Sequence, residues 1–374
     1  MEPFPLVSVV VTVYDRMQFL RTALQSILRQ TFRSFEIIVT DDANNSETRS
    51  ICDSFYKPEI RYRFNASPVG VARNLRVAIS ETRGKYIAIL NDDDAWEPGF
   101  LEPLVTALEN SPERVLAFSD HWIMLEDGQI DVLQTTQNTA RYRRNTLREG
   151  EMSDWAVPAV LDQTIPLAMA ALFRKDAVNW DSLVENVAGA YDYWITCLLA
   201  SCGRPAYYIP QRLSKYRVHS SMETARTAAD KNENMAFIYA RLIELRLFPR
   251  LEASLRRRYR EALFVCGKDY LFFGRVSNAR EYFLRSLKTS LNGKALAGLV
   301  LTCLPRRFRM ACLTALTQRR ISGLLSASSQ NDFHFSGSSN AVGLSGRDWV
   351  EPTILSTEAR DTDQTGSNSD ENTR

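Results

Sequence analysis

Short apolar runs alternate with segments of helical spacing over the first 120 residues. Runs rich in β-branched residues predict strands at 6–13, 35–40, 60–64, 86–90 and 115–119. The apolar spacing between them predicts helices at 19–28, 44–55 and 70–79, and another after Pro98. The run at 6–13 has almost no polar residues, which is typical of a strand buried on both faces. The alternation predicts an α/β fold with a mainly parallel, doubly wound sheet.

The pattern changes after residue 120 and again after residue 230. Within 121–230 it predicts a hairpin, a strand, a helix and a short strand, at 122–133, 167–173, 191–200 and 206–209. Residues 231–325 show helical spacing and many arginines. Residues 326–374 are rich in Ser, Asn, Thr, Asp and Gly, which predicts a disordered tail. We therefore expect three segments, with boundaries at 230 and 325.

The net charge of the 374-residue chain is +2, but the charges are unevenly distributed. Acidic residues predominate in 1–230 and in 326–374, whereas basic residues predominate in 231–325. The near-neutral total argues against a strongly basic nucleic-acid-binding protein, and we recognise no nucleic-acid motif. Two interpretations of the basic segment stay open: clusters such as 256–258 contact anionic lipid headgroups, or the segment is a solvated accessory domain.

The cysteines and the N-terminus indicate a compartment. None of the six cysteines forms a CxxC pair, which favours reduced thiols over a disulfide framework. The N-terminus lacks the basic region of a signal peptide, and no run reaches the ~18 apolar residues of a transmembrane helix. We expect a cytoplasmic protein, with peripheral contact at the inner face of a membrane as a further option.

Two clusters of carboxylates follow predicted strands. Asp92, Asp93 and Asp94 come directly after the strand at 86–90, and Asp41 and Asp42 follow the strand at 35–40. Ligands of open α/β sheets bind beyond the carboxyl ends of strands. Close carboxylates repel one another unless solvent or a cation separates them, and Mg²⁺ or Mn²⁺ binds such groups together with phosphate oxygens. The pattern favours a cation-assisted nucleotide site over acidic turns and helix caps.

Several motifs resemble those of the family 2 glycosyltransferases. The blocks VSVVVTVYDR, EIIVTDDANNSET and GVARNLRVAISETRGKYIAILNDDDAWEPGFLE cover residues 6–120 in the order that this family shows, and AYDYWITCLLASCG and YRVH continue it over 189–220. The resemblance implies a GT-A fold in 1–230, with a nucleotide-sugar half (1–120) and an acceptor half (121–230). It also implies an inverting, metal-assisted transfer from a nucleotide-diphosphate sugar, with UDP-sugars the usual donors. The acceptor would be a hydroxyl of a glycan, a lipid-linked molecule or a small molecule.

The resemblance assigns roles around the donor. Thr12 and Tyr14 would line the nucleotide base, with Asp42 or Asp41 accepting hydrogen bonds from it. Arg73 would approach the base or the diphosphate, which suits the fixed donors of a guanidinium.

The resemblance also implies a site for a divalent metal ion (Mn²⁺ or Mg²⁺). Asp92 and Asp93 fall on the family's DxD region, with Asp92 contacting the ribose or metal and Asp93 as the best metal ligand. Asn91 stands where many members have the first Asp. Arg217 and His219 match a late motif, in which the His completes the metal or diphosphate site.

An inverting transferase needs a carboxylate that deprotonates the acceptor hydroxyl. Members of the family carry it ahead of a Trp at a helix start, and the usual position falls on Ala190 in this chain. Asp192 is the carboxylate of that segment and is our candidate for the base. Substitutes named by the same reasoning are Asp154, Asp162 and Asp120.

Two other functional classes compete with this interpretation. The missing acidic pair at 189–190 is also compatible with a catalytically idle, glycosyltransferase-like module that binds nucleotides. Nucleotidyl transfer would use a metal and paired carboxylates too, but residues 6–120 lack the glycine-rich and basic phosphate loop common in such enzymes.

Overall fold

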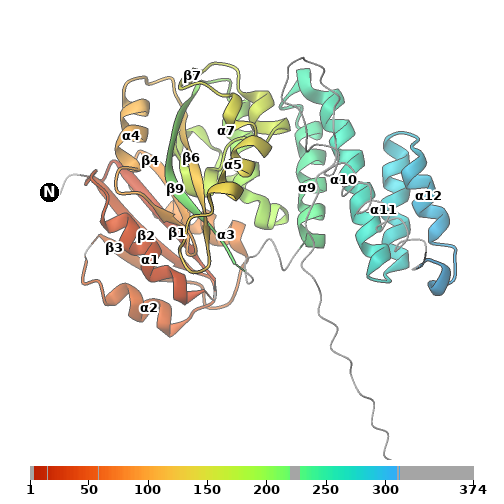
Figure 1. The fold of residues 1–374 in the computed structure, drawn as a ribbon, viewed down its shortest axis with the longest axis horizontal. Helices are drawn as coiled ribbons and strands as arrows, with labels where there is room; N and C mark the ends of the chain where they lie inside the picture. The colour runs from red at the N-terminus through yellow and green to blue at the C-terminus, as the bar shows by residue number, and fades with distance from the viewer. Residues whose placement is uncertain (1–3, 15, 58, 220–227, 310, 312–374) are drawn as a thin grey trace, which may run out of the picture. The chain divides into compact units, whose positions relative to one another are not determined.

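The computed structural model describes residues 4–14, 16–57, 59–219, 228–309 and 311 (Figure 1). The strands are β1 Val7–Val13, β2 Phe35–Asp41, β3 Ile60–Phe64, β4 Tyr86–Asn91, β5 Ala95–Trp96, β6 Leu116–Leu125, β7 Gly150–Met152, β8 Ala171–Arg174 and β9 Ala206–Val218. The helices are α1 Met17–Leu28, α2 Ser46–Asp53, α3 Val71–Ser80, α4 Leu101–Glu109, α5 Val132–Arg141, α6 Leu167–Ala170, α7 Tyr191–Ser201, α9 Ala228–Glu244, α10 Glu252–Phe272, α11 Val276–Thr289 and α12 Gly293–Leu301. The predicted tail at 326–374 lies outside the described residues.

The strands form one mixed sheet in the order β3-β2-β1-β4-β8-β6-β9-β5, with β7 paired to β9. Pairs β3–β2, β2–β1 and β1–β4 are all parallel, as the alternation of strands and helices predicts. Strand β8 runs antiparallel between β4 and β6, and β6 and β9 are parallel again. The prediction of an α/β fold with a mainly parallel central sheet is confirmed.

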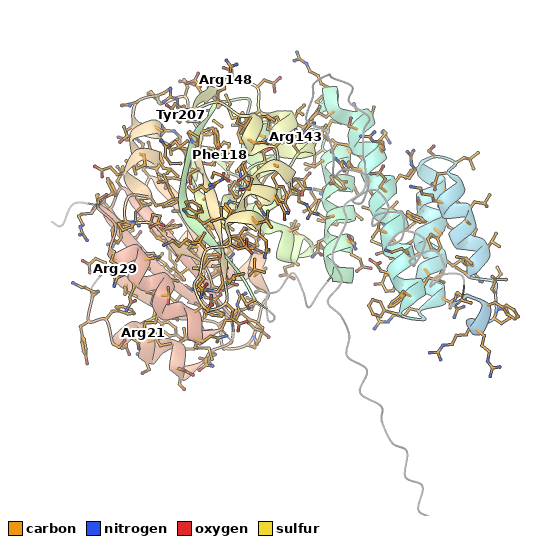
Figure 2. All side chains as sticks on the ribbon, in the orientation of Figure 1. Arg21, Arg29, Phe118, Arg143, Arg148 and Tyr207 are labelled. Atoms are coloured by element: carbon orange, nitrogen blue, oxygen red, sulfur yellow. The ribbon has the colours of Figure 1, made fainter. Side chains whose placement is uncertain are left out.

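The first strand is buried on both faces, as its composition predicts. Val9 and Val11 belong to an apolar cluster that includes side chains of α1, α2 and α4. Val10 belongs to a second cluster, which includes side chains of α3, α7 and α9. Because successive side chains of a strand point to opposite faces, helices cover both faces of the sheet. Figure 2 shows the buried Phe118 inside this body and the exposed Arg21 and Arg143 at its surface.

Three details of 121–230 differ from the sequence predictions. The turn around Gly128 is present, but only one bridge, Met124 to Ile130, forms beyond it, because Asp131 caps helix α5. The run at 167–173 begins as the short helix α6 and becomes a strand only at Ala171. Strand β9 continues through Pro210 to Val218, with irregular register against β6 at Ser119–His121. Proline lacks an N–H, and a break in register accommodates it within a strand.

The helices α9 to α12 account for most of the described part of the basic segment. Ile238 and Leu242 of α9 pack in the same apolar cluster as Trp194 and Ile195 of α7. Phe283 of α11 is buried in a separate cluster with residues of α10 and α12. No helix among the described residues is long and apolar enough to cross a membrane.

Candidate active site

Three parallel strands end side by side at one edge of the sheet. The register places Thr12 of β1 beside Thr40 of β2 and beside Asn91 of β4. The Thr12 hydroxyl donates to Asn91 Oδ1 over 3.0 Å, and the Asp92 N–H donates to the Thr12 carbonyl over 3.2 Å. The polar residues that follow the strands are therefore held close together, as expected from the two acidic clusters.

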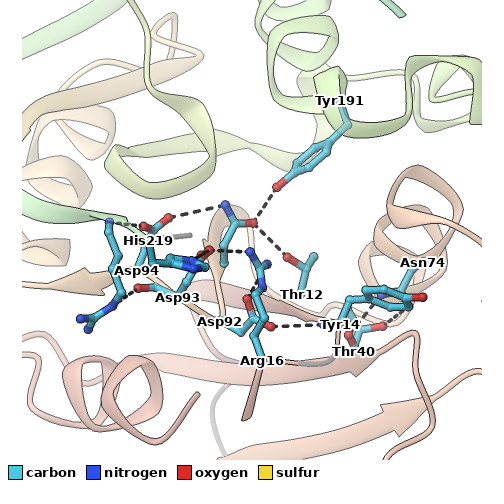
Figure 3. A network of polar contacts seen from close by, with 12 residues as sticks. Thr12, Tyr14, Arg16, Thr40, Asn74, Asp92, Asp93, Asp94, Tyr191 and His219 are labelled. Atoms are coloured by element: carbon cyan, nitrogen blue, oxygen red, sulfur yellow. Dashed lines mark hydrogen bonds and ion pairs between the residues drawn. The ribbon is translucent and has the colours of Figure 1, made fainter. Parts of the chain in front are cut away.

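The three aspartates after β4 have different partners (Figure 3). Asp92 accepts the Tyr14 N–H over 3.2 Å and pairs with Arg16 over 2.6 Å. Asp93 Oδ2 lies 2.5 Å from Arg16 Nη1 and 3.1 Å from His219 Nε2. Asp94 accepts the backbone N–H of Arg217 over 3.0 Å. One guanidinium thus pairs with two neighbouring carboxylates and offsets part of their charge.

Burial controls the electrostatics of this turn. Burial raises the pKa of Asp92 to about 7, and Arg16 opposes this rise while Asp93 adds to it. The pKa of Asp94 is raised well above its usual value, mainly by burial and also by Asp93. Burial would lower the pKa of Arg16, but Asp92 and Asp93 outweigh it and raise that pKa. The turn therefore favours a cation beside it.

The end of β9 closes the site from the other half of the sheet. Arg217 is buried, and its Nε donates to the Asp93 carbonyl over 2.9 Å. Its guanidinium and the His219 ring both lie against the Phe19 ring, at centroid distances of 4.6 and 4.9 Å. Phe19 of α1 thus fixes two side chains that reach the Asp93 turn from a distant part of the sequence.

The carboxylates after β2 hold two loops. Asp42 accepts the N–H groups of Val69 and Gly70 over 2.9 and 2.8 Å, at the start of α3. Asp41 accepts the N–H groups of Ala43 and Asn45 over 2.8 and 2.9 Å. Beside these loops lies an open cavity of about 450 Å³ lined by Tyr14, Ala43, Asn44, Asn45, Ser46 and Pro68.

The start of α7 faces the same turn. The Tyr191 hydroxyl donates to Asn91 Oδ1 over 2.9 Å, so Asp192 follows a residue that touches the end of β4. Asp192 Oδ1 accepts the N–H of Tyr193 over 2.7 Å. Just upstream, Ala188 has φ 36° and ψ −121°, a strained conformation for a residue with a Cβ. Glu185, on the same segment, pairs with Arg73 over 3.6 Å.

Sequence comparison gives the family. Residues 8–155 match the family model described as glycosyl transferase family 2. Glycosyltransferase GlyG of Streptococcus pneumoniae is 31% identical over 285 residues, which cover 74% of this chain and 92% of GlyG. The chain belongs to glycosyltransferase family 2. A further relative is the putative teichuronic acid biosynthesis glycosyltransferase TuaG of Bacillus subtilis, 30% identical over 50% of this chain and 75% of TuaG.

Solved structures share the fold of this glycosyltransferase. S. aureus TarS 1-349 in complex with UDP-GlcNAc superposes with a TM-score of 0.55 at 12% identity, over 79% of this chain and 90% of that one. The mannosyltransferase PcManGT of Pyrobaculum calidifontis, in complex with GDP-Man and Mn²⁺, gives 0.50 at 16% identity, over 86% and 88%. These similarities support the GT-A fold implied by the sequence motifs.

The glycosyltransferase brings most of its predicted site residues to one sheet edge. Thr12, Tyr14, Asp92, Asp93, Arg217 and His219 join one polar network. Asp41 and Asp42 follow the adjacent strand, whereas Arg73 is half-exposed and paired with Glu185. Asp192 lies beside the network through its neighbour Tyr191. Their roles in catalysis stay predictions.

The substitute bases have other contacts in this glycosyltransferase. Asp120 pairs with Arg144 over 2.6 Å and with Arg212 over 3.4 Å. Although burial opposes it, Arg144 holds the pKa of Asp120 below its usual value, which weakens it as a base. Asp162 pairs with Arg143 over 3.3 Å, and Asp154 is exposed.

Sequence reasoning missed Arg16, Tyr191 and the bridging role of Asn91. Arg16 lies three residues after the end of β1, so its place near the strand edge that holds Asp92 was a usable signal. Asn91 accepts hydrogen bonds from Thr12 and Tyr191. Its amide is suited to this position because a fourth carboxylate beside Asp92, Asp93 and Asp94 would add repulsion to the turn.

Proposed function

We propose that this glycosyltransferase catalyses an inverting, metal-assisted transfer of a sugar from a nucleoside-diphosphate donor to a hydroxyl of a glycan or glycoconjugate. The observation that carries the proposal is the network that gathers Asp92, Asp93, Arg217 and His219 beside an open cavity. Structural neighbours were solved with UDP-GlcNAc and with GDP-Man, and TuaG is named for teichuronic acid biosynthesis. A UDP-sugar is our first choice of donor.

The donor occupies the edge where β1, β2 and β4 end. The nucleotide base enters the cavity against Tyr14, whose side chain is 46% exposed and therefore available for stacking. Asp41 and Asp42 order the loops that line this cavity through backbone hydrogen bonds. Arg73 and Arg217 supply positive charge for the diphosphate, and Asp92 is the ribose contact.

Asp93 and His219 can supply two protein ligands for a divalent cation. Asp93 Oδ2 and His219 Nε2 lie 3.1 Å apart, a separation that two ligands of one cation can have. Within the described ranges, no group of three or more His, Cys, Asp or Glu side chains converges on one point. The remaining ligands would be diphosphate oxygens and water, which Mg²⁺ and Mn²⁺ accept. When bound, the ion offsets charge on the departing diphosphate.

Asp192 serves as the general base. Its helix start is tied to the end of β4 by the Tyr191–Asn91 hydrogen bond, which keeps Asp192 beside the donor edge. The carboxylate takes the proton from the acceptor hydroxyl as the oxygen attacks the anomeric carbon, and the bond to the diphosphate breaks. Ala190, at the usual base position of the family, has no group that can do this.

A catalytically idle nucleotide-binding module is the second candidate, and the observation that favours it is the buried Ala190. Incubation with UDP-GlcNAc, UDP-glucose or GDP-mannose and Mn²⁺ distinguishes the two. Release of a nucleoside diphosphate that requires Asp192 supports the enzyme. Binding of UDP without turnover, unchanged by Asp192→Asn, supports the idle module.

The acceptor is a membrane-associated glycan or lipid-linked molecule, and 231–325 is an accessory domain in peripheral contact with the inner face of an anionic membrane. Exposed aromatic and basic side chains support this. Phe272 and Phe273 at the end of α10 and Phe308 after α12 are 57–67% exposed, and Phe308 directly follows the exposed Arg306 and Arg307. Aromatic and basic side chains together favour an anionic bilayer surface. We assign 1–230 to catalysis and a cytoplasmic location to the whole protein.

A further inference from the structure

Arg16 has a position that the chemistry proposed above does not explain. Its guanidinium pairs with Asp92 Oδ1 over 2.6 Å and with Asp93 Oδ2 over 2.5 Å. The Arg16 side chain is 18% exposed, and those of Asp92 and Asp93 are 0% and 9% exposed. The fork therefore spans two neighbouring carboxylates in a largely dry site, where charge pairs interact strongly (Figure 3).

Arg16 and the proposed metal ion would both need the same oxygen, Asp93 Oδ2. It touches Arg16 Nη1 and also lies 3.1 Å from His219 Nε2. A metal ion held by Asp93 and His219 would need this oxygen at about 2.0–2.2 Å. A guanidinium 2.5 Å from the same oxygen stands in the way, by both its volume and its charge.

We infer that Arg16 is a resident countercharge that must leave the Asp92–Asp93 pair before a divalent cation can bind there. The inference rests on the metal site proposed above. The movement of Arg16 is then part of metal binding, and until the metal binds, the paired guanidinium stabilises the two carboxylates.

The departing guanidinium also connects the metal to the nucleotide. Away from Asp93, Arg16 has donors to satisfy, and a diphosphate beside the strand ends offers oxygens for a charge-assisted pair. Metal alone must therefore displace Arg16 with no new partner for it, whereas metal with a nucleoside diphosphate supplies one. This predicts weak binding of the ion alone and mutual strengthening of ion and diphosphate, as linkage requires.

Titration of the intact protein with Mn²⁺, following the free-ion signal by electron paramagnetic resonance, tests the inference without any turnover. Arg16→Ala should bind Mn²⁺ alone about tenfold more tightly than the wild type, and the gain in affinity caused by UDP should shrink. Arg16→Gln, which keeps an amide donor but loses the charge, should change both quantities in the same direction and guards against misfolding of the first variant. Arg21→Ala is the matched control, because Arg21 is an exposed arginine of α1, the helix that begins directly after Arg16.

The variants separate two kinds of failure. If Asp93→Asn abolishes Mn²⁺ binding but Arg16→Ala and Arg16→Gln bind Mn²⁺ no more tightly than the wild type, displacement of Arg16 is wrong and the metal site stands. If Asp93→Asn binds Mn²⁺ as well as the wild type, the proposed metal site is wrong, and the inference about Arg16 falls with it.

Discussion

At the scale of single residues, Asp93 bears most of the proposed chemistry. One of its oxygens contacts both His219 and Arg16, and its own carbonyl accepts from Arg217. Asp93→Asn keeps the size of the side chain and removes its charge. The loss of a group that holds a cation against the leaving diphosphate should reduce sugar transfer by at least about 100-fold. Asp181→Asn, on an exposed turn, should leave transfer unchanged. Equal transfer by Asp93→Asn and the wild type would contradict the assignment.

The proposed role of Asp192 predicts different effects on catalysis and on UDP binding, because a general base acts on the acceptor rather than on the donor. Asp192→Asn should lower the rate of transfer by about 10²–10⁴ while the dissociation constant for UDP stays the same. Calorimetry measures the second quantity and product formation the first. Asp154→Asn, an exposed substitute candidate, serves as the control. A reversed result, with transfer lost only in Asp154→Asn, would move the base to that residue.

The burial of His121 predicts that the stability of the folded protein depends on pH. Burial lowers its pKa to about 3, with Arg144 contributing and Asp120 opposing. Asp120 and Arg212 also face it. Because the folded-state pKa lies below the unfolded value of about 6.5, the stabilising contribution is complete above pH 6.5 and is lost as the pH falls toward 3.

The wild type should therefore lose stability relative to His121→Phe by up to about 1.4 kcal/mol per pH unit in that range. Urea unfolding of both proteins from pH 7 to pH 4 measures the difference. A difference in unfolding free energy that is constant with pH would show that His121 does not remain neutral in the folded protein.

At the scale of elements, one aromatic ring joins three helices. Phe283 of α11 is buried between Gly267 of α10 and Gly298 of α12, and a Cβ on either glycine would lie 2.6 Å from the ring. Both glycines are thus needed for close approach of the helices.

Gly298→Ala should lower the free energy of unfolding by about 1–3 kcal/mol through overpacking, despite the better helix propensity of alanine. Gly293→Ala, in the same helix with open space around it, should be neutral or stabilising. Adding Phe283→Leu should restore part of the loss in Gly298→Ala. Equal stability of the two alanine variants would contradict the packing described here.

The elements that the sequence predicts well are those whose pattern is local. Strands β1 to β4 and helix α7 carry continuous apolar runs or helical spacing, and their predicted ends differ from the observed ones by a few residues. Helix α5 was missed because its apolar face is small and Thr135 and Thr139 supply its buried positions. Strand β9 was cut at Pro210, since only a neighbour such as β6 shows how the chain continues.

The same distinction applies to the site. Carboxylates at strand ends can be found from the sequence, because parallel strands end at one edge. The position of Arg16 near this edge can be found in the same way, but its pairing with Asp92 cannot. That pairing and the Tyr191–Asn91 hydrogen bond join residues 76 and 100 positions apart, which a local pattern does not predict.

At the scale of the whole molecule, the near-neutral net charge is the sum of oppositely charged parts of the chain. The acidic part of the chain contains the carboxylate edge, and the basic part contains α9 to α12. The Arg280 side chain donates to Thr302 over 3.3 Å, which ties the start of α11 to the end of α12. Phe272, Phe273 and Phe308 therefore belong to one end of this helical segment, whereas Leu291 lies in the turn at the other end.

The proposed membrane contact can be tested at this end of the helical segment. Replacing Phe272, Phe273 and Phe308 by serine should reduce binding to vesicles of phosphatidylglycerol and phosphatidylcholine by more than about tenfold, because burying one such ring contributes about 1.5–3 kcal/mol. Leu291→Ser is the control, since its side chain is 91% exposed at the opposite end. Co-sedimentation measures the bound fraction. If the triple variant binds the vesicles as tightly as the wild type does, the membrane contact lies elsewhere in the protein.

The most direct test of the central claim is analysis of the products formed from a panel of nucleotide sugars. The protein is incubated with UDP-GlcNAc, UDP-glucose or GDP-mannose, with Mn²⁺ or with a chelator, and the released nucleotide is identified. The account predicts release of a nucleoside diphosphate that requires the divalent ion and is lost in Asp93→Asn. Release of pyrophosphate instead, or the same nucleoside diphosphate yield with the chelator and in Asp93→Asn, would contradict it.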